Sequence, residues 1–313
     1  MQDRVPNSKF PYQCQPNCSV YDTARNHNNN LNSSLIKLVI EFKTGSDSDP
    51  FVDPRLLKKS KVGDTFRNPF MVTSSKAQVV AGQIIAYATL VLSAQYHTHV
   101  FLVLVFKEYS RLIHWDCGGA VVTAPISHTK DPHLLDFLIH FNNAGTQARG
   151  WDITVTTPSP AEETAAWTVH ELRGNIPLVK LSISDPSQLD ETNHYITGVP
   201  FSRSDILACC WTRTSITYDV ERQQRILLKD SWRVIFLDIT PEGEIYKRLN
   251  RNSVPNIPLY FWAGDVGDSN FHAFSTHKFN DEYGSPCVTA RYLEQLRRAQ
   301  HLIAKSYYDL ECL

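Results

Sequence analysis

The chain has 313 residues, of which 42% are hydrophobic and 20% are charged, a composition typical of a folded protein with two domains. Its 31 basic and 32 acidic residues nearly cancel, so charge gives no support for nucleic-acid binding. The most apolar stretch, 87–106, is interrupted by Gln95, His97 and His99, which excludes the ~20 uninterrupted apolar residues of a membrane span. Seven irregularly spaced cysteines and a polar start without a signal pattern indicate an intracellular protein, cytoplasmic or nuclear.

The first half of the chain alternates between strand and helix patterns after a polar start. Residues 1–33 are rich in Asn and Gln and poor in apolar side chains, so we predict a mobile leader. Residues 35–43 alternate apolar and polar side chains, as a half-buried strand does. Further elements are expected in this order: a helix at about 76–96 capped by Ser74-Ser75, strands at 100–107, 111–115 and 120–123, and helices from 131 to 145 and from 161 to 172.

The region after about residue 188 has a different pattern. Strands are expected at 213–220 and 225–232 around a polar turn. A helix is expected to follow, with Thr240 as N-cap and Pro241 as its first residue, and to run to Leu249. A fourth strand is expected at 257–262, and the apolar spacing of 290–308 predicts an amphipathic helix. We therefore predict an α+β fold with two domains, an N-terminal mixed-sheet domain at 34–187 and a second domain at 188–313.

One pair of charged residues in the second domain points to nucleotide chemistry. Lys229 follows the apolar strand residues 226–228, and Glu242 lies in the first turn of the next helix. A protein-kinase small lobe needs such a pair, because the strand ammonium contacts the ATP phosphates and the helix carboxylate holds the ammonium in place. A lysine at a strand end is more often only a solvated charge, so the pair alone is weak support.

A family resemblance adds to this pair. Over roughly residues 35–265, motifs in the expected order resemble the fungal-type protein kinase family. These motifs include Ile40-Glu41-Phe42-Lys43, Asp49-Pro50-Phe51, Gln83-x-x-x-Tyr87, Thr98-His99-Val100-Phe101, Arg111-Leu112-Ile113-His114-Trp115-Asp116, Gly119-Ala120-Val121-Val122-Thr123, Gly150-Trp151-Asp152, Leu228-Lys229-Asp230-Ser231-Trp232, Pro241-Glu242-Gly243-Glu244 and Val254-Pro255-Asn256-Ile257-Pro258. The resemblance implies transfer of phosphate from Mg·ATP to protein Ser or Thr, with Lys229 on the ATP phosphates and Glu242, or else Glu244, as its helix partner.

The sequence also departs from a complete kinase. No H-R-D loop and no D-F-G motif in the required order follows Lys229. His114-Trp115-Asp116 lies before the lysine, and Asp265-Val266-Gly267 has no catalytic loop ahead of it, so we interpret both as imitations. We therefore expect an incomplete small lobe in a truncated, pseudokinase-like member that is inactive alone. Its exposed face predicts either low stability or an unknown protein partner that covers this surface.

A second constellation lies in the N-terminal domain. Glu41 and Lys43 share one face of a strand, and Gln83 and Tyr87 are one turn apart on the next helix. This pattern is similar to the core of PD-(D/E)xK nucleases, in which a carboxylate binds Mg²⁺ and the lysine positions the attacking water. The required upstream Asp is missing, because Asp22, the nearest, falls in the predicted leader.

Three hypotheses therefore stand. The chain is a kinase-derived protein that binds ATP and Mg²⁺ by family resemblance, or a non-catalytic binding module, or a Mg²⁺-dependent nuclease-like protein. His97-x-His99 has a spacing seen in metal sites, but without a third ligand nearby we predict no metal centre of its own.

Overall fold

A computed structural model describes residues 15–21, 33–53, 55, 71–116, 119–170, 178–185, 188–198, 200, 202–203, 212–234, 240–261, 263–265 and 296–304. Its contacts divide the chain into two compact units, and both combine a β-sheet with helices, as the α+β prediction requires. Unit 1 runs to Trp151, and unit 2 begins at Asp152 and includes the strand at 296–304.

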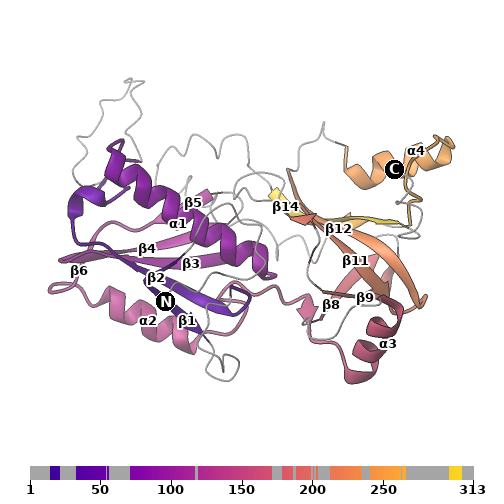
Figure 1. Cartoon of the computed structure of the whole chain (residues 1–313), viewed down its shortest axis with the longest axis horizontal. Helices are drawn as coiled ribbons and strands as arrows, with labels where there is room; N and C mark the ends of the chain where they lie inside the picture. The colour runs from indigo at the N-terminus through magenta and orange to yellow at the C-terminus, as the bar shows by residue number, and fades with distance from the viewer. Residues whose placement is uncertain are drawn as a thin grey trace. The chain divides into compact units, whose positions relative to one another are not determined.

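Unit 1 is built on a mixed sheet in the order β1-β2-β3-β4-β5, with β6 paired to β4 (Figure 1). The strands are β1 Cys18–Tyr21, β2 Ile36–Phe42, β3 His99–Val105, β4 Tyr109–Asp116, β5 Gly119–Val122 and β6 Ile126–Ser127. The β2–β3 pair is parallel and the other pairs are antiparallel. The parallel pair requires a crossover, which the helix α1, Ser75–Ala94, supplies between the two strands.

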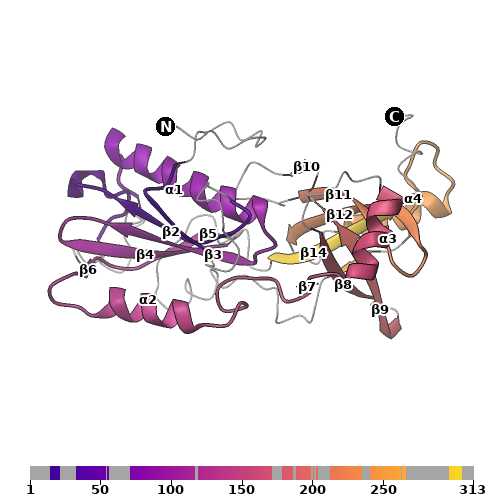
Figure 2. The ribbon, with the colours of Figure 1, turned by 60° about the horizontal axis from the view of Figure 1, so that its bottom comes forward.

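Two helices cover the two faces of this sheet, as Figure 2 shows. α1 begins where Ser74 Oγ accepts a hydrogen bond from the Ala77 N–H, which confirms the predicted cap. The second helix, α2 at His133–Asn143, places Phe141 against Leu38 and Val103. α1 is also the one described helix with the length and apolar composition of a membrane span, and 61% of its apolar window is buried within the protein.

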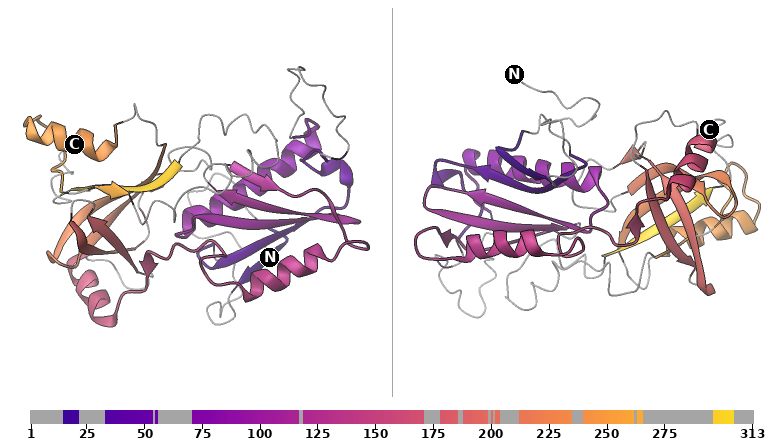
Figure 3. Two further views of the ribbon diagram at one scale, coloured as in Figure 1. Left: turned by 180° about the vertical axis from the view of Figure 1, so that it is seen from behind. Right: turned by 90° about the horizontal axis from the view of Figure 1, so that it is seen from below.

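Unit 2 contains a sheet in the order β7-β8-β9-β11-β12-β14-β13, with β10 paired to β11 (Figure 3). The strands are β7 Val155–Thr156, β8 Val179–Asp185, β9 Gln188–Thr197, β10 Ser202–Arg203, β11 Thr212–Asp219, β12 Gln224–Val234, β13 Gly264–Asp265 and β14 Leu296–Ala304. Every pair in this sheet is antiparallel. The β11–β12 hairpin confirms the predicted strand pair and its polar turn.

Helix α3, Pro160–His170, packs on this sheet through Ala166, which lies in a core with Leu178, Ile196 and Tyr218. Helix α4, Glu242–Arg251, follows β12 and contacts β14. Gly243 is the one residue of α4 that is fully buried. A Cβ at this position would lie 2.3 Å from the Ala263 Cβ, so the start of α4 approaches its neighbour as closely as only glycine permits.

The N-terminal part of the chain differs from the prediction. Residues 18–21, which we expected in a mobile leader, form β1 and pair with β2 from Ile36 to Ile40. The segment joins the fold through backbone hydrogen bonds, which its polar composition does not reveal. The boundary near 187/188 also differs, because β7 pairs with β8 and α3 packs on β9 and β11, so residues after 151 belong to unit 2.

Two elements of the second half were predicted wrongly. Residues 296–304, expected in a helix, form β14, which pairs with β12 from Leu227 to Val234. Of the strand expected at 257–262, Tyr260 forms an isolated bridge, and Trp262 lies outside the described residues. Here the Asn250 side chain donates to the Pro258 carbonyl and accepts from the Tyr260 N–H, so polar groups that a strand would pair are used by α4.

Candidate functional site

Lys229 and Glu242 meet in unit 2. The Lys229 Nζ lies 2.5 Å from Glu242 Oε1 and 2.6 Å from Oε2, so the ammonium contacts both carboxylate oxygens. Lys229 is on β12, which has β11 on one side and β14 on the other, and it faces away from the buried Ile226 and Leu228. The two side chains are 27% and 33% exposed, so the pair is reachable from solvent.

The alternative helix partner, Glu244, does not reach Lys229. Its side chain is 52% exposed and lies 3.5 Å from Lys247 on the same helix. Residues 242 and 244 are about 200° apart around a helix, so only one of the two can face the sheet. The structure therefore pairs Lys229 with Glu242, the first choice of the two.

The four nuclease-like residues also come together, in unit 1. Lys43 Nζ lies 2.7 Å from Glu41 Oε1 and 2.8 Å from Gln83 Oε1, which joins β2 to α1. Tyr87, one turn further along α1, donates its hydroxyl to the Gln15 carbonyl at 3.0 Å. Glu41 is 3% exposed, and its charge is balanced by the Lys43 ammonium. Strand alternation and helical spacing thus brought these side chains to one face, as expected.

Asn17 is a fifth member of this cluster that the sequence did not indicate. Its backbone N–H donates to Glu41 Oε2 at 3.0 Å, and its Oδ1 accepts from the Phe42 N–H at 2.9 Å. Asn17 directly precedes β1, so the pairing of β1 with β2 places it beside Glu41. Asp22, the upstream carboxylate considered for the nuclease resemblance, lies outside the described residues.

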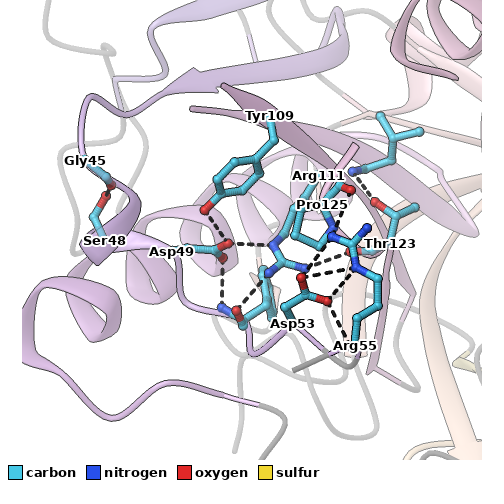
Figure 4. Close-up of polar contacts among 11 residues, drawn as sticks. Gly45, Ser48, Asp49, Asp53, Arg55, Tyr109, Arg111, Thr123 and Pro125 are labelled. Atoms are coloured by element: carbon cyan, nitrogen blue, oxygen red, sulfur yellow. Dashed lines mark hydrogen bonds and ion pairs between the residues drawn. The ribbon is translucent and has the colours of Figure 1, made fainter. Parts of the chain in front are cut away.

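A third polar cluster was not predicted as a unit (Figure 4). Arg111 on β4 donates from Nε to Asp49 Oδ2 at 2.7 Å, and the Tyr109 hydroxyl donates to the same oxygen at 2.9 Å. Arg111 also donates to the carbonyls of Thr123 and Phe51, both at 2.9 Å. The Arg111 side chain is 2% exposed, so this is a buried ion pair that ties the segment after β2 to β4.

The Asp49 cluster forms one wall of an open pocket of about 810 Å³. Burial and the hydrogen bond to the Asp49 carboxylate raise the pKa of the Tyr109 hydroxyl far above its usual range, so the phenol stays protonated and keeps donating. Arg55 closes onto Asp53 at the pocket rim, at 2.9 Å. These groups satisfy one another, and the cluster therefore has the contacts of a structural support.

The histidines of the His97-x-His99 motif do not converge on one point. The His97 ring lies edge-on to Trp151, whereas His99 stacks on His114 with ring centroids 4.7 Å apart. Burial lowers the pKa of both His99 and His114 to about 4, and the neighbouring His114 contributes to the shift at His99. In the part of the chain that the structure describes, no group of three His, Cys, Asp or Glu side chains is arranged to hold a metal ion.

Of the two kinase-like imitations, the first lies on a strand, and only the aspartate of the second falls within the described residues. His114, Trp115 and Asp116 are part of β4, and Asp265 is the last residue of β13.

Comparison of the chain with protein-family models, curated proteins and solved structures gives no match. Function therefore has to be inferred from the clusters themselves.

Proposed function

We propose that unit 2 is a nucleotide-binding lobe in which Lys229 holds the phosphates of Mg·ATP, in the manner of a protein-kinase small lobe. The double contact between Lys229 Nζ and both oxygens of Glu242 is the observation that supports this proposal most directly. The fungal-type kinase resemblance selects the same two residues.

The placement of the ammonium suits a phosphate ligand. β12 lies inside the sheet, between β11 and β14, and its pairing with β11 is regular through Lys229, whereas its pairing with β14 shifts register between Leu228 and Lys229. A lysine ammonium lies at the end of a flexible four-carbon stem, and the ion pair with Glu242 restrains the position of this ammonium. The ammonium has three N–H donors, so it can contact Glu242 and still donate to a ligand. Part of this ammonium is reachable from solvent, where a phosphate oxygen can accept a hydrogen bond from it.

The contribution of Glu242 is positional. Ion pairs with this degree of exposure contribute at most about 1 kcal/mol to folding, because water and salt screen them. Their value for binding is that the ammonium is already aligned, which lowers the entropic cost of fixing it when the ligand arrives. Transfer of phosphate to a protein Ser or Thr would in addition require an aspartate base and Mg²⁺ ligands. Within the described ranges, no group of three His, Cys, Asp or Glu side chains is arranged for a metal ion.

Calorimetric titration of the whole chain with Mg·ATP tests the proposal. Lys229→Met should weaken binding by about 10- to 100-fold, because a hydrogen bond to a charged group is worth about 1.5–3 kcal/mol. Glu242→Gln keeps the ammonium but loosens its position, so a smaller loss is expected.

Lys247→Met is the matched control, since Lys247 has the same charge, lies on α4 and pairs with Glu244 instead of Glu242. It should bind Mg·ATP as the unchanged chain does. Equal binding by the Lys229→Met and Lys247→Met variants, or no binding by the unchanged chain at millimolar Mg·ATP, would contradict the proposal. Melting temperatures of all variants separate loss of binding from loss of folding.

A second candidate function is favoured by the meeting of Glu41, Lys43 and Gln83 in unit 1. This arrangement supports a nuclease-like origin for unit 1, whose ligand would be a phosphodiester. Magnesium-dependent cleavage of DNA that is lost in Glu41→Ala would support nuclease activity. Absence of both ATP binding and cleavage would leave a non-catalytic binding module.

A further inference from the structure

The nuclease-like arrangement implies a divalent cation next to Glu41, and the contacts of the oxygens around Glu41 decide whether such a cation fits. Mg²⁺ and Mn²⁺ are bound in proteins mainly by oxygen ligands, and carboxylates supply most of the required negative charge. The cluster around Glu41 contains oxygens from β2, α1 and the residue before β1. The relevant question is which cation these oxygens hold.

The oxygens of this cluster already coordinate an ammonium. Lys43 Nζ lies between Glu41 Oε1 at 2.7 Å and Gln83 Oε1 at 2.8 Å, which are ordinary distances for a charge-assisted hydrogen bond. The second oxygen of Glu41 accepts the Asn17 N–H at 3.0 Å. Both oxygens of the Glu41 carboxylate are therefore used by groups of the chain itself.

Charge leads to the same result. Glu41 is the one carboxylate in the cluster, and Lys43 balances it, so the group is neutral overall. A divalent cation would have to displace the ammonium or sit beside it and be repelled. Asn17 brings an amide where a carboxylate would add the missing negative charge. The residues present thus do not fit a bound Mg²⁺.

We infer that the Lys43 ammonium takes the place of the divalent cation in unit 1, and that Asn17 keeps the site in this metal-free form. In this form, the Lys43 ammonium bridges the Glu41 carboxylate and the Gln83 amide and so connects β2 to α1. This inference rests on the nuclease-like arrangement of unit 1, speaks against Mg²⁺-dependent cleavage there, and is independent of ATP binding at Lys229. It predicts that one additional carboxylate converts the cluster into a divalent-cation site.

Asn17→Asp is the direct test, because an Asp carboxylate keeps an oxygen for the Phe42 N–H and replaces the amide nitrogen by a second oxygen. We would titrate the whole chain with Mn²⁺ alone by calorimetry. The unchanged chain should show no Mn²⁺ binding that depends on Glu41, whereas Asn17→Asp should bind Mn²⁺ at least 10-fold more tightly. Adding Glu41→Gln to Asn17→Asp should abolish the gain.

Two further variants make the test decisive. Asn142→Asp, at an exposed position of α2, adds the same charge elsewhere in unit 1 and should leave Mn²⁺ binding unchanged. Lys43→Met removes the ammonium and should also raise Mn²⁺ binding above that of the unchanged chain, which covers the case in which Asn17→Asp does not fold. Mn²⁺ binding by the unchanged chain that Glu41→Gln removes would overturn the inference. Folded Asn17→Asp and Lys43→Met proteins that both bind Mn²⁺ no better than the unchanged chain would also overturn it.

Discussion

Replacing Asp49 by alanine is expected to lower the stability of unit 1 and to leave the stability of unit 2 unchanged. The substitution leaves the Arg111 guanidinium, 2% exposed, without its carboxylate, and the Tyr109 hydroxyl without its acceptor (Figure 4). Removing one partner of a buried ion pair typically costs about 3–5 kcal/mol, because the remaining charge is left in a poorly solvated place. The loss of the Tyr109 hydrogen bond adds about 1 kcal/mol. We therefore expect a total of about 4–6 kcal/mol.

The two units allow the assay to contain its own reference. Hydrogen exchange followed by mass spectrometry in increasing urea reports the unfolding of peptides from each unit separately. With a urea dependence of about 1–3 kcal/mol per molar, Asp49→Ala should lower the midpoint for unit 1 peptides by more than about 1 M. Peptides from unit 2 should keep their midpoint.

Other variants identify the cause of the loss. Asp47→Ala removes an exposed carboxylate that pairs with the exposed Lys76, and it should have no measurable effect. The double variant Asp49→Leu with Arg111→Met should recover part of the stability, because apolar replacement of both partners removes the unpaired charge. The recovery is incomplete because the hydrogen bonds from Tyr109 to Asp49 and from Arg111 to the Thr123 and Phe51 carbonyls are also lost. A loss below about 1 kcal/mol for Asp49→Ala would refute the reasoning that this buried pair supports unit 1.

Two further predictions concern acid stability and glycine. His99 and His114 have pKa values of about 4 in the fold, below the usual value near 6.5. Their contribution to stability is therefore present above pH 6.5 and is lost as the pH falls toward 4. Proton NMR titration should show two rings that stay neutral at pH 5.5, and rings that both titrate near 6.5 would contradict this prediction. Gly150→Ala should destabilise unit 1 by more than about 1 kcal/mol, because Gly150 has a φ of +101° and a Cβ would lie 2.0 Å from the His99 carbonyl oxygen. Gly82 lies in α1 with no other atom near the added carbon, so Gly82→Ala should stabilise unit 1 by about 1 kcal/mol. Melting temperatures that shift in the same direction for both glycine variants would contradict this pair of predictions.

Local periodicity predicted strands whose pairing partners are close in sequence and elements that have a long, regular pattern of apolar residues. The alternation at residues 35–43 predicted β2, and the apolar spacing after Ser74 predicted α1. The pairing of Glu41 with Lys43 follows from the two-residue period of one strand. The pairing of Lys229 with Glu242 was predicted from the kinase small-lobe pattern, in which a strand lysine meets a carboxylate of the next helix. Such geometry depends on the local backbone more than on distant pairing.

Pairing between distant segments was not predictable in this way. β14 has apolar residues at helical spacing, and only its place beside β12 makes it a strand, an example of tertiary context overriding local preference. β1 and Asn17 lie in a polar segment whose composition resembles disorder, yet backbone hydrogen bonds to β2 and Glu41 order it. The Asp49–Arg111 pair joins residues 62 positions apart, and nothing in either local pattern links the two.

The position of β14 sets a constraint on the order of folding. β12 already pairs with β11 through a short turn, whereas its other neighbour comes from the far end of the described chain. Until that late segment arrives, β12 presents an open edge with unpaired backbone groups, which is a template for association with other chains. Closure of so long a connection is slow compared with hairpin formation. During synthesis, unit 2 should therefore pass through a period in which a chaperone or rapid docking of β14 protects it from aggregation.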